Sequence, residues 1–201
     1  MTELKSLKRL ITEFSKLPWI GEKTAQRLAY FILKKGESFS APFTEAVQNI
    51  SKQIKSCTKC FSFTETEGLC EICSDSRRDQ SMICVVEEPF DILKIESSQS
   101  YQGLYHVLHG SIAPLEGVSP EHLKIKELME RIDRSEKGIR EVILAFDADI
   151  EGDTTALYLT KLLHQRHVKT SRLAYGVPFG SDIDYIDKRT LGKAIENRVE
   201  L

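Results

Sequence analysis

The chain opens with apolar residues at helical spacing. Between positions 4 and 17 they recur every three or four residues, which predicts an amphipathic helix with one buried face. The stretch "LPWIG" interrupts this pattern. Pro18 cannot continue a helix, and Gly21 supplies a flexible backbone for a turn.

A second helix is predicted over 22–35, because Ala25, Leu28, Ala29 and Ile32 share one face. The next residues, "GESFSAPF", combine glycine, serine and proline, so we expect a linker over 36–43. Thr44 is then expected to cap a short third helix that runs toward Lys55.

The pattern changes after residue 78, where short β-branched runs alternate with helical segments. The predicted strands are "MICVVEE", "YHVLHG", "EVILAF" and "VKTSRLAYG". The predicted helices cover 89–97, 119–134 and 153–167, with a closing helix from Thr190. Ser119 is the expected cap of the second of these, and Asp153 or Thr154 that of the third. This alternation predicts a mainly parallel α/β sheet across 81–175.

Length and composition limit the class of protein. With 201 residues, 41% of them hydrophobic, the chain can form one ordinary core or two small ones. No apolar run approaches the roughly 18 residues that span a bilayer, and "MTELKSLKRL" lacks the apolar region of a signal peptide. We therefore expect a cytoplasmic protein without a membrane partner.

Charge is unevenly distributed, although the net charge is only −2. Residues 1–60 contain eleven Lys and Arg against five Asp and Glu, so the rest of the chain is acidic. A basic head on an acidic body suggests contact with a polyanion, while a solvated charged surface is the alternative.

The sequence "LPWIGEKTAQRLAYFIL" resembles a helix–hairpin–helix DNA-binding motif. A tight turn before a helix exposes backbone N–H groups at the positive end of the helix dipole, where they can bind a phosphate without reading sequence. The expected DNA-contacting residues are Gly21, Lys23, Arg27 and Lys34. The alternative is an ordinary helix pair with a solvated basic face.

Trp19 departs from the usual motif, which has glycine at this position. The absence of glycine disfavours a positive φ there. We expect Trp19 to pack into the hairpin, and stacking on an unpaired base is the other use of such a side chain.

Four of the five cysteines form two C-x₂-C pairs, Cys57 with Cys60 and Cys70 with Cys73, separated by nine residues. Two such pairs can present four thiolates to one tetrahedral Zn²⁺ and leave no position for water. We therefore predict one structural zinc ion per chain. Cys84 lies within an apolar run and is expected to be a buried core thiol.

Acidic residues follow two of the predicted strands. Glu87 ends the first strand, and Asp147, Asp149 and Glu151 follow "EVILAF". The arrangement resembles the Toprim domain, in which a Glu and a D-x-D pair hold a metal ion at the carboxyl ends of parallel strands. Such oxygen ligands suit Mg²⁺. The alternatives are a solvated acidic loop and a negative crevice that receives a basic partner surface.

The hairpin, the cysteine pairs and the Toprim-like segment, in this order, resemble the RecR family of bacterial recombination mediators over essentially the whole chain. Loops such as "HGSIAPLEG" belong to this resemblance. It implies four regions: a helix–hairpin–helix region (1–55), a four-cysteine zinc finger (56–78), a Toprim domain (79–178) and an oligomerisation segment (179–201). It also implies a homotetramer that works with RecO and RecF at the nucleoid to load RecA on single-strand gaps, and a Toprim crevice that meets RecO.

The resemblance implies a protein without catalytic residues that binds single- and double-stranded DNA. The equivalent of "DAD" in the family is usually non-acidic, whereas both aspartates are present here. The runner-up function is therefore a Mg²⁺-dependent Toprim nuclease. In that case Glu87 would be the general acid or base, and Asp147 and Asp149 would be metal ligands.

Overall fold

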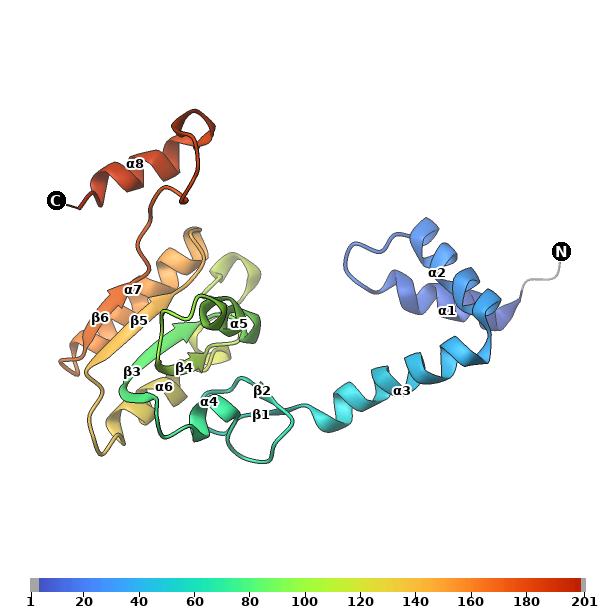
Figure 1. Cartoon of the computed structure of the whole chain (residues 1–201), viewed down its shortest axis with the longest axis horizontal. Coiled ribbons are helices and arrows are strands. Elements are labelled where there is room, and N and C mark those ends of the chain that lie inside the picture. The colour runs from blue at the N-terminus through green and yellow to red at the C-terminus, as the bar shows by residue number, and fades with distance from the viewer. Residues whose placement is uncertain (1–3, 200–201) are drawn as a thin grey trace. The chain divides into compact units, whose positions relative to one another are not determined.

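The computed structural model describes residues 4–199, and the chain divides into two compact units between Ile54 and Lys55 (Figure 1). The described part of the first unit forms α1 (Lys5–Ser15), α2 (Glu22–Lys35) and α3 (Glu37–Gln53). Ala25 and Ala29 of α2 are completely buried. Because these small side chains lie one helical turn apart, α1 can approach α2 closely, with Leu7, Leu10, Ile11 and Phe14 half-buried on its inner face.

The linker predicted over 36–43 is wrong. Gly36 alone breaks the chain, with a φ of +73°, and α3 begins at the next residue. Pro42 lies inside this helix. Phe39 stacks on Phe43 with 5.9 Å between ring centroids and meets Phe31 of α2 edge-on at 5.2 Å. These contacts between aromatic rings favour helical structure where the local composition suggested a coil.

The second unit begins with a small module that contains the four cysteines. A short antiparallel hairpin joins β1 (Lys55–Ser56) to β2 (Phe63–Thr64), and α4 (Glu71–Ser74) follows. The buried residues of this module are the cysteines themselves, packed with Ile72. A segment with so little apolar core depends on a cross-link or a metal for its stability.

A parallel four-stranded sheet forms the body of the second unit, in the order β4-β3-β5-β6. The strands are β3 (Asp79–Val86), β4 (Gly103–Val107), β5 (Glu141–Ala145) and β6 (Lys169–Arg172). Helices α5 (Pro89–Ser97), α6 (Ile125–Asp133) and α7 (Ile150–His164) connect them. The predicted α/β class is therefore confirmed.

Side chains of β3 alternate between two cores. Ile83 and Val85 pack with α6 and α7, whereas Cys84 and Val86 pack with α5 on the other face. Cys84 is 2% exposed, as expected of a core thiol. The sheet is thus covered on both faces, and its topology reverses between β3 and β5, the place where open α/β sheets bind ligands.

The predicted start of one helix in this unit and the predicted extent of another are wrong. Neither Asp153 nor Thr154 caps α7: the cap is Asp149, whose carboxylate accepts a hydrogen bond from the Gly152 N–H at 2.8 Å. Ser119 is the cap of a helical turn that starts at Pro120, as predicted, but this turn ends at His122 and α6 starts separately at Ile125. The interruption allows the Lys124 N–H to donate to the Leu108 carbonyl at 3.1 Å.

The C-terminal segment ends in α8 (Lys188–Glu196). Its cap is Asp187, whose carboxylate accepts hydrogen bonds from the N–H groups of Arg189 and Thr190, so the helix begins two residues before the predicted start. Within residues 4–199, no helix combines the length and the apolar character that crossing a membrane requires.

Candidate nucleic-acid interface and metal centre

The turn between α1 and α2 presents an uncapped helix N-terminus. Gly21 is the N-cap of α2, and no side chain accepts a hydrogen bond from the first-turn N–H groups. A Cβ added to Gly21 would meet no atom within 4 Å, so the space beside this residue is open. The dipole of a 14-residue helix makes this end attractive to an anion.

Basic side chains follow this N-terminus along α2. Lys23 and Arg27 lie one turn apart and are exposed, and neither forms an ion pair within residues 4–199. Lys34 projects from the same face, in the last turn of the helix, about 16 Å from Lys23 along the axis. Gly21, Lys23 and Arg27 therefore form one local group, and Lys34 lies at the opposite end of the helix.

The structure contradicts two expectations for Trp19, that it packs into the hairpin and that its φ is negative. Its side chain is fully exposed, at 101% of the reference area, and does not pack into the hairpin. Its φ is +59°, so the left-handed residue of the turn is the tryptophan, while Gly21 has a φ of −76°.

The four predicted zinc ligands converge in space. The sulfur atoms of Cys57, Cys60, Cys70 and Cys73 all lie within 4.8 Å of one another, and all four residues are buried. The Sγ atoms of Cys60 and Cys70 are 3.6 Å apart. Four ligands about 2.3 Å from a tetrahedral zinc ion would be about 3.8 Å from one another. The donor set and its spacing therefore fit a metal ion.

Backbone geometry also favours thiolates at this cluster. The Cys70 N–H donates to the Cys57 Sγ at 3.3 Å, and Phe61 takes a left-handed φ of +64° as the chain turns out of the first cysteine pair. An N–H donor directed at sulfur stabilises the charged form that binds metal.

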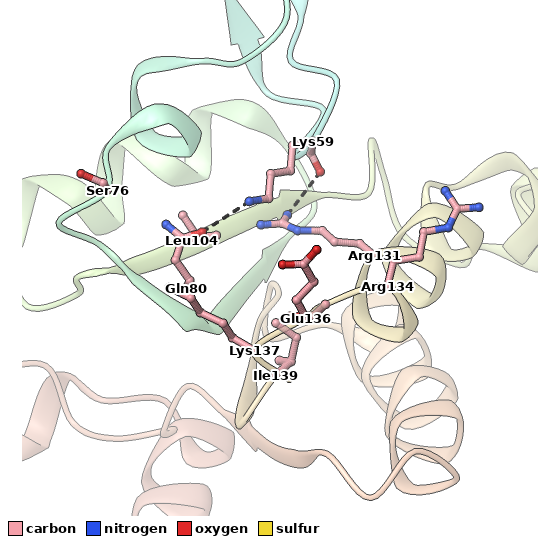
Figure 2. A pocket seen from close by; sticks show the side chains of 10 residues that line it. Lys59, Ser76, Gln80, Leu104, Arg131, Arg134, Glu136, Lys137 and Ile139 are labelled. Carbon is pink, nitrogen blue, oxygen red and sulfur yellow. Dashed lines mark hydrogen bonds between the residues drawn. The ribbon is translucent and has the colours of Figure 1, made fainter.

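Hydrogen bonds attach the cysteine module to the edge strand β4. The Cys60 carbonyl accepts from the Val107 N–H at 2.8 Å, and His109 Nε2 donates to the Phe61 carbonyl at 2.8 Å. Arg131 of α6 donates through Nη1 to the Lys59 carbonyl at 3.3 Å (Figure 2). The same Nη1 donates to the Tyr105 carbonyl at 2.6 Å. The first cysteine pair is therefore an extension of the sheet. No pattern in the sequence singled out Arg131 or His109 for this role.

Arg131 also borders a cavity of about 520 Å³ between the cysteine module and the end of α6 (Figure 2). Its other lining residues include Lys59, Arg134, Glu136 and Lys137. The Nη2 atom of Arg131 is buried and has no hydrogen-bond partner among residues 4–199. Burial lowers the pKa of Arg131, while the nearby cysteines raise it. The guanidinium thus supplies positive charge beside the sulfur cluster.

The acidic residues lie at the carboxyl ends of β3 and β5, next to the topological reversal. We call Glu87, Asp147, Asp149 and Glu151 the acidic edge. Glu87 Oε1 accepts a hydrogen bond from the Asp147 N–H at 3.3 Å. Asp149 is directed instead toward the Gly152 N–H as the α7 cap, and Glu151 lies in the first turn of that helix.

The two aspartates are not paired on a strand, because β5 already ends at Ala145. Gly152 lets the loop fold tightly, since a Cβ there would come within 2.3 Å of the Asp147 carbonyl oxygen. Within residues 4–199, the cysteine sulfurs are the group of three or more metal-ligating side chains that converge within 4.8 Å. The acidic edge is negative, but its oxygen atoms do not surround one point.

Glu87 is the residue of the acidic edge whose pKa is shifted. Its pKa is raised to about 7, chiefly by burial, with a further increase from the charges of Asp147 and Asp149. The hydrogen bond from the Asp147 N–H opposes this shift. A carboxyl group of this kind accepts a proton near neutral pH or pairs with a positive group brought by a ligand.

Comparisons with known proteins agree along the chain. Residues 7–50 match the RecR helix–hairpin–helix family model, residues 81–174 the Toprim domain and residues 176–199 the RecR C-terminal model. Recombination protein RecR of Bdellovibrio bacteriovorus is 52% identical, covering 100% of both chains. The RecR of Syntrophotalea carbinolica is 47% identical over 98% of this chain and 97% of its own length. The RecR of Myxococcus xanthus is 44% identical over 97% of this chain and 98% of its own length. The chain therefore belongs to the RecR family of recombination proteins.

Proposed function

We propose that this protein is a mediator of recombinational DNA repair that holds DNA through the α1–α2 hairpin and breaks no bonds. Membership of the RecR family supports the repair role. The observation that carries DNA binding is the uncapped N-terminus of α2 beside exposed Lys23 and Arg27. Backbone N–H groups and cations directed at phosphate bind single- and double-stranded DNA without regard to sequence.

The partners follow from the same family membership. We infer that the chain works with RecO and RecF in the cytoplasm to help load RecA on single-strand gaps. The acidic edge suits a basic partner surface, because complementary charge steers association and fixes register. Calorimetric titration of RecO into the protein and into the Asp147→Asn, Asp149→Asn double variant measures this contact. Equal affinities would remove the acidic edge from the RecO interface.

We assign one structural zinc ion to Cys57, Cys60, Cys70 and Cys73. The support is a buried, closed set of four sulfur donors, which leaves no position for substrate or water. A Mg²⁺ ion at the acidic edge has weaker support, since the carboxylates there do not converge on one point.

The DNA-binding proposal is tested with the double variant Lys23→Ala, Arg27→Ala. Fluorescence anisotropy with labelled single- and double-stranded oligonucleotides is recorded over a range of salt concentrations. We expect affinity to fall at least tenfold, and the slope of log K against log salt to decrease by about two, because two phosphate contacts are lost. The matched control is Lys126→Ala, Lys161→Ala, which removes two exposed lysines of the second unit. Equal losses in both double variants would exclude a specific role for the hairpin.

A plasmid-nicking assay tests whether the protein cleaves DNA. Supercoiled plasmid incubated with the protein and Mg²⁺ or Mn²⁺ is expected to stay intact, because metal-assisted cleavage requires carboxylates that gather around the ion. Nicking that disappears in Asp147→Asn would establish the alternative, a Toprim nuclease.

A further inference from the structure

Trp19, the single tryptophan of the chain, combines an exposed apolar side chain with a strained backbone. Its side chain is fully exposed to solvent. Its backbone φ of +59° lies in the left-handed region, which glycine enters freely and other residues enter only at an energetic cost. A large apolar side chain held in a strained, exposed conformation marks a position with a function outside the folded chain.

The turn between α1 and α2 requires the left-handed backbone at position 19, but it does not explain why the residue there is a tryptophan. α1 and α2 close around Ala25 and Ala29, and the turn is tied by the hydrogen bonds Leu17 N–H to Phe14 O at 3.1 Å and Ile20 N–H to Leu17 O at 3.2 Å. Trp19 contributes no side-chain packing to this arrangement. A glycine would take the same backbone conformation without strain.

The position of Trp19 relates it to the phosphate-binding end of α2. It lies two residues before the N-cap Gly21, at the same end of the helix as the open space and Lys23. A phosphate bound by the first-turn N–H groups would bring its nucleotide to this end of the helix, where the indole ring is exposed. In an uninterrupted duplex the flat faces of the bases are covered by their neighbours, whereas an unpaired base leaves a face free.

We propose that Trp19 stacks on an unpaired base and thereby directs the hairpin to DNA in which a single strand adjoins a duplex end. The inference rests on the proposed binding of DNA by the hairpin, and it adds the class of DNA preferred. Lys23 and Arg27 supply contact with the backbone of any DNA, and Trp19 supplies the discrimination. Stacking on an aromatic side chain corresponds to roughly 5- to 150-fold in affinity.

The single tryptophan makes the contact directly measurable. Intrinsic fluorescence of the full-length protein is titrated with a duplex carrying a single-stranded overhang and with a blunt duplex of equal charge. Anisotropy of the labelled DNA confirms saturation in both cases. We expect the emission to be quenched by the overhang substrate and unchanged by the blunt duplex. Placing abasic nucleotides at the junction should abolish the quenching while anisotropy still reports binding.

Two variants test the preference independently of fluorescence. Trp19→Gly relieves the backbone strain, so it folds at least as well as the parent, and it should lose about tenfold in affinity for the overhang substrate and none for blunt duplex. Trp19→Phe keeps an aromatic face and should retain most of the preference.

The outcomes are distinguishable. If the parent protein binds neither DNA substrate, the proposed function itself is contradicted. Binding with unchanged emission, together with equal affinities for Trp19→Gly and the parent, overturns the stacking proposal and leaves the proposed function in place. A blue-shifted emission in free protein that DNA does not alter also overturns it, because Trp19 would then be buried between copies of the chain.

Discussion

The left-handed backbone of the hairpin falls on Trp19, and the residue that suits such a conformation, Gly21, has an ordinary negative φ. A similar exchange occurs at Asp149. Its place in "DAD" suggested a metal ligand, yet its carboxylate caps α7. Residue type predicted where chemistry would concentrate, but local backbone geometry determined which residue takes which role.

The raised pKa of Glu87 predicts a pH-dependent contribution to stability. The folded protein binds this proton up to about pH 7, well above the ordinary value of about 4.5, so the contribution of Glu87 to the free energy of unfolding decreases as pH rises through this window. We expect Glu87→Gln to be more stable than the parent above pH 7 by about 1 kcal/mol, a figure reduced because Glu87 is only half-buried. At pH 4 the gain should vanish.

Denaturant unfolding at several pH values measures this difference. Glu116→Gln, which removes an exposed carboxylate of a surface turn, is the matched control and should show no such crossover. A constant difference between Glu87→Gln and the parent from pH 4 to pH 8 would contradict the prediction.

Among the elements, the cysteine module depends most on a contribution from outside its own sequence. Its buried residues are the four cysteines, and its attachment to the sheet runs through the carbonyls of Lys59, Cys60 and Phe61. α3 also depends on a contact outside its own sequence. Its helix forms in spite of Pro42 and a serine-rich start, because the aromatic contact with α2 favours it.

Metal removal should therefore open the module and leave the sheet intact. Elemental analysis is expected to find one zinc ion per chain. Chelation, or Cys57→Ser, should abolish hydrogen-exchange protection over 57–73 and at the Val107 amide, which donates to the Cys60 carbonyl. Amides in the middle of β5 should stay protected. Cys84→Ala removes a core thiol outside the cluster and should retain the metal. Full protection of 57–73 after complete metal loss would show that the module folds without zinc.

At the scale of the whole molecule, α3 and its C-cap Ile54 carry an apolar stripe that the helices of the first unit leave largely exposed. Its members recur at helical spacing and are 36–61% exposed: Phe39, Phe43, Val47, Ile50 and Ile54. No residue of α3 is buried. A stripe of this length is normally covered by another protein surface. We infer that copies of the chain associate through it, in line with the homotetramer that the family resemblance implies.

Light scattering coupled to size-exclusion chromatography tests this assembly. We expect the parent protein to have four times the 22.9 kDa chain mass. The double variant Val47→Glu, Ile50→Glu should form a smaller assembly, because burial of two charges of each chain at the interface is unfavourable. Ala41→Glu with Gln48→Glu adds the same charge on the side of α3 away from the stripe and should leave the mass of the assembly unchanged. A monomeric parent protein would exclude the tetramer.

The sequence by itself determined the order of the elements, the α/β class and the chemical classes of the sites. Hydrophobic periodicity and C-x₂-C spacing act over a few residues, so they can be recognised without a structure. The tertiary structure decided what depends on residues far apart in the chain. It joins Arg131 to the carbonyl of Lys59, directs the Asp149 carboxylate to the Gly152 N–H as the cap of α7, and leaves Trp19 exposed. These outcomes follow from packing and hydrogen-bond competition in three dimensions, which local patterns do not encode.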